Sequence, residues 1–317
     1  MATKISLIGA GHIGGTIALL SAIKNLGNIV LVDIAKGIAK GKALDISHSL
    51  PVFQCNRKII GTTSLKQIKD SNVIVVTAGV PRKAGMSRDD LVEVNLKVMK
   101  NIGRDIKRYS PKSFVIVVTN PLDVMTWALQ KITNIPYSHI VGMAGVLDTS
   151  RFEFHLSEEL GVPVEDVSSS VLGGHGDDMV ALLRYTTVSG TSLAEMIEKR
   201  KITTEKVNDI VKRIRTCGAE LITYMGTSAY YAPAAAAVQM IECYLRDKKK
   251  TLPCSAYLKG QYGVKGLYVG VPVVLGANGA EKIVEINLTK EEKKEFIKSV
   301  NSVKEILNIA KKLFSIN

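Results

Sequence analysis

Two arginines in residues 79–91 are placed to bind an anionic small molecule. Arg82 and Arg88 lie six residues apart, in a loop bracketed by glycines and a proline, directly after the apolar run 73–76. Each guanidinium group can donate two parallel hydrogen bonds to a carboxylate. Open α/β sheets bind ligands at the carboxyl ends of their strands. The loop therefore predicts a movable lid over a molecule with more than one anionic group, although a solvated basic loop would have the same composition.

A second candidate is His175, which stands among glycines in Gly-Gly-His-Gly-Asp. Because glycines give the imidazole little side-chain cover, a ligand can approach it closely. Asp148 and Arg151 are spaced i and i+3 on a helix expected over residues 147–160, which puts both side chains on one face. Taken alone, that spacing is more simply explained by a surface ion pair. The rings of the other histidines, His12, His48, His139 and His155, are expected to be structural, with that of His12 pointing away from the glycine-rich loop in which it lies.

The segment Gly-Ala-Gly-His-Ile-Gly predicts a phosphate-binding loop. An expected strand over residues 4–8 precedes it, a helix follows it, and Asp33 ends the next strand 19 residues after the third glycine. This context is typical of dinucleotide binding, with the pyrophosphate at the helix N-terminus and the acidic side chain at the ribose. The charge of Asp33 favours NAD over NADP, a preference that Lys36 weakens slightly. A strand–turn–helix without a dinucleotide is the alternative. The predicted contacts are Gly9, Ala10, Gly11, His12, Ile13, Gly14 and Asp33.

Two asparagines are further candidates. Asn120 follows a strand expected over residues 113–118 and precedes a proline, so its amide is placed where ligand groups arrive. A turn-forming asparagine would occupy the same position. Asn95, on the first turns of the helix after the arginine loop, gives a fainter indication of the same kind.

These candidates depend on an alternation of strands and helices in the first half of the chain. Continuous β-branched runs separated by helices are typical of a parallel sheet covered on both faces. We predict an α/β fold: a Rossmann-type doubly wound parallel sheet in an NAD-binding domain over residues 1–144, then an α+β substrate and catalytic domain over residues 145–317. Expected strands lie at residues 4–8, 28–32, 58–61, 72–77, 113–118 and 139–142, and later at 168–172, 252–258 and 268–275.

Composition limits the class of protein. The chain has 317 residues, of which 46% are hydrophobic and 22% charged, and these are globular values. Its four cysteines lack metal-ligand spacing, so we expect reduced thiols, no metal site and a cytoplasmic location. We expect no export signal and no membrane span. The net charge of +13 is spread over the chain without interleaved aromatics, so nucleic-acid binding is not expected.

Five motifs, in order, resemble the lactate/malate dehydrogenase family. They are Gly-Ala-Gly-His-Ile-Gly, Gly-Val-Pro-Arg-Lys-Ala-Gly-Met-Ser-Arg-Asp-Asp-Leu, Val-Thr-Asn-Pro-Leu-Asp, Asp-Thr-Ser-Arg-Phe and Gly-Gly-His-Gly-Asp, and they span nearly the whole chain. Within the family the chain is most similar to the lactate-dehydrogenase-like malate dehydrogenases. Their lid carries arginine where lactate enzymes carry glutamine, and here that position is Arg82.

The resemblance implies NAD as the cofactor, malate and oxaloacetate as substrates, and a homo-oligomer, either dimer or tetramer. It implies that His175 accepts the substrate proton with Asp148 as its partner, and that Arg88 polarises the reacting carbonyl. Arg151 would bind the substrate carboxylate, which leaves Arg82 for a second carboxylate. The implied NAD contacts are Asn95, Val118, Thr119 and Asn120, and Asn120 would also reach the substrate.

One residue departs from the family pattern, because Thr227 stands where malate enzymes are expected to carry glycine. The same machinery acting on lactate or another 2-hydroxy acid is therefore an alternative. A non-catalytic NAD-sensing module is a third hypothesis, but such a module has no need for the full set of His175, Asp148, Arg88 and Arg151. Loss of NADH with oxaloacetate and with pyruvate, measured side by side, separates these possibilities.

Overall fold

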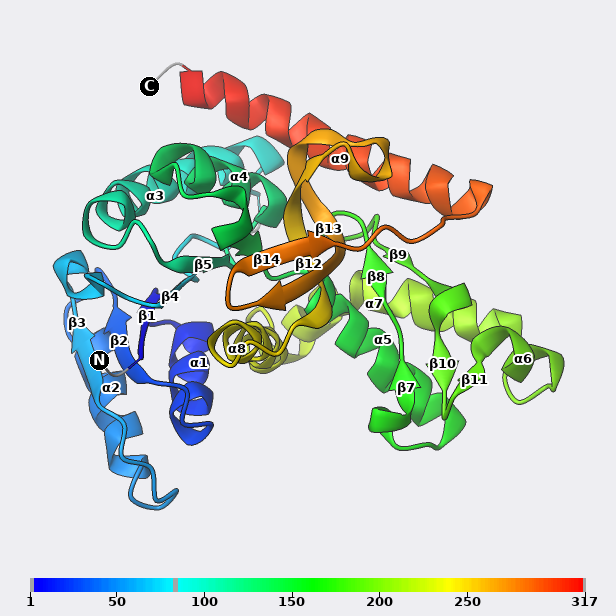
Figure 1. Ribbon diagram of the computed structural model, residues 1–317, viewed down its shortest axis with the longest axis horizontal. Coiled ribbons are helices and arrows are strands. Elements are labelled where there is room, and N and C mark those ends of the chain that lie inside the picture. Colours follow the sequence, from blue (N-terminus) through cyan, green and yellow to red (C-terminus); the bar gives the residue numbers. More distant parts are fainter. Residues whose placement is uncertain (1–2, 82–84, 316–317) are drawn as a thin grey trace.

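One mixed β-sheet organises the computed structural model, which describes residues 3–81 and 85–315 (Figure 1). The first half of the chain contributes β1 Lys4–Ile8, β2 Asn28–Val32, β3 Ile59–Thr62, β4 Val73–Val76, β5 Phe114–Val117 and β6 Ile140–Gly142. The second half contributes β12 Lys250–Lys259, β13 Lys265–Gly276 and β14 Gly279–Ile283. Within the described ranges these nine strands follow the order β14-β13-β12-β6-β5-β4-β1-β2-β3.

The strands of the first half pair in parallel, whereas β12, β13 and β14 are antiparallel. Every residue of β4 and β5 is buried, because their continuous apolar runs lie under helices on both faces. The predicted Rossmann-type doubly wound sheet is therefore confirmed. The second half extends the same sheet, since Ser255 of β12 pairs with Gly142 of β6.

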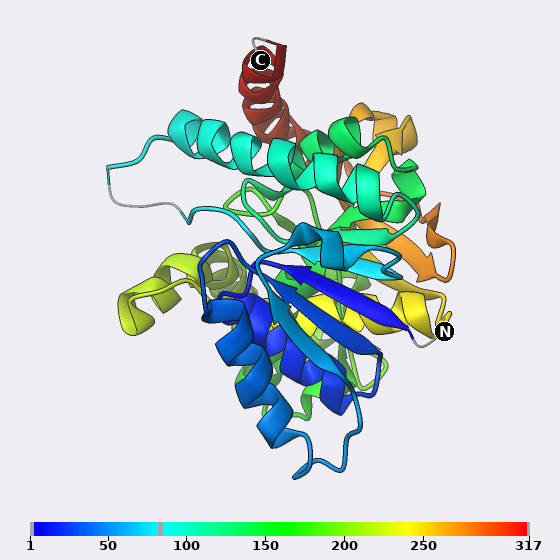
Figure 2. The same ribbon diagram turned by 90° about the vertical axis from the view of Figure 1, so that its left-hand side faces the viewer.

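Helices cover both faces of the sheet, as Figure 2 shows. The helices α1 and α2 lie on one face with α8, whereas α3, α4 and α9 lie on the other. Figure 1 shows α9 running back from the second half over α3 and α4. None of the helices in the described ranges is both long and apolar enough to cross a membrane. The helices are α1 His12–Ile23, α2 Ile38–Ser49, α3 Arg88–Tyr109, α4 Leu122–Thr133, α5 Gly145–Leu160, α6 Leu193–Glu198, α7 Thr204–Met225, α8 Tyr231–Leu245 and α9 Lys290–Ser315.

The register of the parallel strands brings the predicted site together at one edge. Ile8 at the end of β1 is aligned with Val76 at the end of β4, and Val76 is aligned with Val117 at the end of β5. The glycine-rich loop, the arginine loop and the segment 118–120 therefore leave the sheet side by side. This edge is the carboxyl edge, where open α/β sheets bind ligands.

Side chains near two helix starts fix where those helices begin. Ser87 and Asp90 form a reciprocal pair of hydrogen bonds that starts α3, so Arg88 is its first residue. Thr289 and Glu292 do the same for α9, as their spacing predicts. Arg88, at the end of the arginine loop, thus has a defined backbone position.

The expected strand over residues 168–172 is interrupted in the structure. Val167–Ser168 forms β7, which pairs with β10 Thr187–Val188, and Val171–Leu172 forms β8, which pairs with β9 Val180–Ala181. Side chains of α5 accept hydrogen bonds from the backbone amides around this break, because Glu153 accepts from Ser169 N and Thr149 accepts from Val171 N. These bonds replace strand pairing and turn the chain toward the His175 loop. A short strand β11 Thr191–Ser192 completes the small sheet of β7 and β10.

Candidate active site

The centre of the site is a hydrogen-bonded pair, His175 and Asp148. Nδ1 of His175 lies 2.9 Å from Oδ2 of Asp148, a carboxylate in the first turn of α5 that is almost fully buried. The carboxylate raises the pKa of His175, and burial of the ring opposes it. Because a carboxylate only accepts, Nδ1 carries the proton in the neutral ring. Nε2 is then free to take a proton from a ligand, which is the arrangement of a general base.

Arg151 completes a cluster around the same carboxylate. Its guanidinium Nη1 lies 3.6 Å from Oδ1 of Asp148, and its side chain is only 13% exposed. The i and i+3 spacing therefore joins the two residues near the start of α5, beside His175 and not on an open surface. The charge of Arg151 lowers the pKa of His175 and so limits the effect of Asp148.

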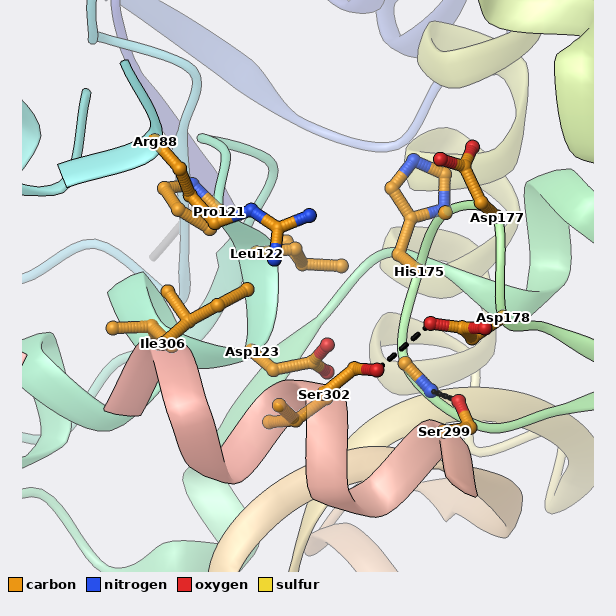
Figure 3. A pocket seen from close by; sticks show the side chains of 14 residues that line it. Arg88, Pro121, Leu122, Asp123, His175, Asp177, Asp178, Ser299, Ser302 and Ile306 are labelled. Carbon is orange, nitrogen blue, oxygen red and sulfur yellow. Dashed lines mark hydrogen bonds between the residues drawn. The ribbon is translucent and has the colours of Figure 1, made fainter. Parts of the chain in front are cut away.

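A cleft separates His175 from Arg88, and Figure 3 shows the two side chains facing each other from opposite sides. Pro121, Leu122 and Asp123 of the loop and helix after β5 line the same cleft, and α9 borders it with Ser299, Ser302, Val303 and Ile306. Arg88 is exposed at the start of α3. Arg82 lies outside the described residues. Of the other predicted ionic side chains, Arg88 and His175 line the cleft, and Asp148 with Arg151 adjoins His175.

The glycine-rich loop has the open backbone that a pyrophosphate needs. Gly9 has φ +109°, and a Cβ there would lie 2.5 Å from Thr77 Oγ1, while a Cβ on Gly14 would collide with the carbonyl oxygen of Gly9. A Cβ on Gly11, by contrast, meets nothing within 4 Å. The first turn of α1 also lacks a side-chain cap. Its amides and its positive dipole end therefore face open space, which fits the phosphates of a dinucleotide.

Asp33 lies beside this loop. Its Oδ2 accepts a hydrogen bond from Ala10 N at 2.8 Å, and its Oδ1 accepts one from Ala35 N at 2.9 Å. Sequence reasoning missed Lys42, whose ammonium group donates to the carbonyl oxygen of Gly11 at 2.7 Å. No sequence motif includes this lysine of α2, so the sequence alone did not identify it. It brings a positive charge to the loop in which phosphates are expected.

Asn95 ties the base of the arginine loop to the strand end next to it. Its Oδ1 accepts from Val80 N, and its Nδ2 donates to Val80 O and Asn120 O. Thr119 Oγ1 donates to Ala78 O in the same region. Val118 is buried, whereas Asn120 is exposed at the edge. Of these four predicted contacts, Asn120 presents its side chain most openly, while the amide of Asn95 is used to hold two backbone segments.

Sequence reasoning also missed Asp123 and Ser299, which stand behind the histidine. Ser299 Oγ accepts from Gly174 N at 2.9 Å, and burial raises the pKa of Asp123 to about 6. Asp123 is the last residue of the motif Val-Thr-Asn-Pro-Leu-Asp, and this motif is the sequence signal that could have identified it. Ser299 is 125 residues from Gly174 and had none.

Fold and site together define a dinucleotide-binding α/β protein with a histidine–carboxylate pair and basic side chains at the carboxyl edge of its sheet. Residues 3–142 match the model of the lactate/malate dehydrogenase NAD-binding domain, and residues 145–314 match that of the family's alpha/beta C-terminal domain. The chain belongs to the lactate/malate dehydrogenase family, and it is an oxidoreductase that uses NAD.

Individual relatives cover nearly the whole chain. A malate dehydrogenase of Methylobacterium radiotolerans is 54% identical over 309 residues, which are 97% of either chain. The crystal structure of Cryptosporidium parvum malate dehydrogenase superimposes with a TM-score of 0.96 at 45% identity, covering 98% of this chain and 100% of the other. A lactate dehydrogenase from the same organism, complexed with lactic acid and the dinucleotide, has a TM-score of 0.95 at 43% identity and covers 98% of each chain.

Proposed function

We propose that this chain catalyses the reversible, NAD-dependent oxidation of malate to oxaloacetate. The observation that carries the proposal is the cluster of His175, Asp148 and Arg151 opposite Arg88, in a chain 54% identical to a malate dehydrogenase. Oxidation of a 2-hydroxy acid requires one oriented base to take the hydroxyl proton. It also requires a cation that binds the carboxylate and a cation that stabilises the reacting oxygen. An NAD-sensing module would have no use for that cluster.

Each side chain of this cluster has its own role in the oxidation of malate. NAD, when bound at the glycine-rich loop, supplies the acceptor for the hydride that leaves C2 of malate. Nε2 of His175 takes the hydroxyl proton, and Asp148 holds the ring orientation and stabilises the imidazolium. Arg151 binds the C1 carboxylate, and Arg88 with Asn120 stabilises the charge that develops on the C2 oxygen. In the reverse direction the protonated His175 returns its proton to the carbonyl oxygen.

Specificity for malate is assigned to Arg82, which we propose as the partner of the C4 carboxylate. This assignment rests on the position of Arg82 in the arginine loop and on the family resemblance. Lactate is the second candidate substrate, because the similar lactate dehydrogenase structure binds lactic acid and Thr227 departs from the pattern of malate enzymes. Closure of the loop would exclude water from the site in either case.

Two further observations bear on the compartment and the assembly of the protein. The four cysteines are unpaired, which fits a reducing, cytoplasmic compartment. We propose a homo-oligomer, dimer or tetramer, because exposed apolar side chains on α2, α7 and α8 suit subunit contacts. They are Ile38, Leu44, Ile222, Tyr224 and Tyr231. A role in the tricarboxylic acid cycle and a domain boundary between residues 144 and 145 complete the proposal.

The decisive assay compares oxaloacetate and pyruvate with NADH in the same preparation. We expect a kcat/KM ratio well above one in favour of oxaloacetate. A lactate dehydrogenase would reverse the ratio, and a sensing module would consume NADH with neither substrate while still binding it.

A further inference from the structure

Asp123 is a buried carboxyl group that has no role in the proposed reaction. It lies in the first turn of α4, directly after the strand end that carries Asn120, and is only 6% exposed. Its Oδ1 accepts a short hydrogen bond, 2.5 Å long, from the hydroxyl of Ser255 on β12. Burying a carboxyl group is costly unless its oxygens are used. Its second oxygen is therefore expected to have a polar neighbour as well.

That second oxygen faces the backbone of the His175 loop. A Cβ on Gly174 would lie 3.4 Å from Oδ2 of Asp123, so the loop runs in contact distance of this carboxyl. The same Cβ would lie 2.5 Å from Cγ2 of Val303, which only a glycine avoids. Both the backbone amide of His175 and the charge of its ring lower the pKa of this carboxyl against the effect of burial. Figure 3 shows Asp123 at the cleft below Arg88, on the side where Ser299 binds the same loop.

We infer that Asp123 is a positioning residue for His175: it anchors the histidine loop through the backbone and adds a second negative charge near the imidazole. This inference rests on the proposed function only for its effect on catalysis. Asp148 binds the ring directly, whereas Asp123 acts through the loop and through space. Ser255 holds Asp123 in turn, so a residue of β12 is linked to the general base.

The charges around Asp123 fix the direction of its effect. The charge of Asp148 is the largest influence that raises the pKa of His175, and Asp123 adds to it, whereas burial and Arg151 lower it. The charged groups around the carboxyl are Asp148 and Arg151 on α5, His175, Asp177 and Asp178 on the loop, Arg88 on α3 and, through Asp178, Lys298 on α9. Removing the charge of Asp123 therefore lowers the pKa of His175.

The test is an NMR titration of His175 in the full-length protein with isotope-labelled histidine rings, with the signal assigned by loss in His175→Gln. In Asp123→Asn, which keeps the size of the side chain, we expect the pKa of His175 to fall by about 0.5 to 1 unit. In Ser255→Ala we expect a smaller fall, because Asp123 loses the hydroxyl that favours its charged form. Ser255→Ala also decides the matter if Asp123→Asn does not fold.

The matched control is Glu242→Gln. Glu242 is an equally buried carboxylate, on α8, bound by Lys24, Arg246 and Lys248. Its loss should lower the melting temperature and leave the pKa of His175 unchanged. Kinetics add a second readout: in Asp123→Asn the alkaline limit of oxaloacetate reduction should move to lower pH while NADH affinity is kept.

The outcomes separate the two proposals. A lowered pKa of His175 without turnover of oxaloacetate supports the positioning role and contradicts the proposed function. An unchanged pKa of His175 in the folded Asp123→Asn and Ser255→Ala variants overturns the positioning role, whatever the protein catalyses.

Discussion

Replacing Asp148→Asn should disable the general base while leaving the fold in place. The asparagine keeps the size of the side chain but removes a charge whose oxygen lies 2.9 Å from Nδ1 of His175. At an effective dielectric constant of about 20, unit charges about 4 Å apart attract by about 4 kcal/mol. Because one pKa unit corresponds to about 1.4 kcal/mol, the pKa of His175 should fall by at most about three units. Arg151 remains beside the ring and lowers the pKa of His175 further. Oxaloacetate reduction, which needs the imidazolium, should slow by about 10²- to 10⁴-fold near neutral pH.

The assay follows kcat/KM for oxaloacetate between roughly pH 6 and 9, with NADH affinity measured separately by fluorescence. We expect the alkaline limit to move to lower pH in Asp148→Asn and the NADH dissociation constant to stay close to that of the wild type. An efficiency within tenfold of wild type together with an unshifted profile would refute the role of Asp148. A loss of NADH binding would instead mean that the substitution disturbed the fold.

Three further predictions concern other parts of the chain. Asp33→Ser should narrow the preference for NAD over NADP, because the carboxylate no longer repels a 2′-phosphate; the kcat/KM values for the two cofactors measure it. Arg82→Gln should lower kcat/KM for oxaloacetate roughly ten- to 150-fold, from a charge-assisted bond worth about 1.5 to 3 kcal/mol, and should spare pyruvate. Burial raises the pKa of Glu153 to about 7, so its ionisation destabilises the fold as pH rises from about 4.5 through 7. Glu153→Gln should therefore raise the melting temperature more at pH 8 than at pH 5, and an equal change at both would contradict this reasoning.

Local sequence signals were sufficient for the parallel sheet and for the edge that carries the site. The buried strands β4 and β5 are unbroken apolar runs, and the registers of β1, β4 and β5 place Asn120 at the same edge of the sheet as the glycine-rich loop. The i and i+3 spacing of Asp148 and Arg151 likewise predicted a shared face. What the spacing could not show is that His175 packs against that face, and this came from family resemblance.

The parts of the fold and the site that the sequence did not predict depend on contacts between residues far apart in the chain. The partners of Asp123 and Gly174 are Ser255 and Ser299, which lie 132 and 125 residues away in the sequence. No periodicity or spacing marks such pairs. The break in the expected strand over residues 168–172 has a similar cause, because Glu153 and Thr149 on a packed helix take the amide hydrogens that strand pairing would use.

The most direct test of the account is turnover by His175→Asn in both directions. This variant keeps the approximate size of the side chain and removes the group that exchanges the proton. We expect kcat for malate oxidation and for oxaloacetate reduction to fall by about 10²- to 10⁴-fold, with NADH binding nearly intact. Turnover close to that of the wild type would contradict the assignment of His175 as the base, and with it the mechanism built around the His175–Asp148 pair.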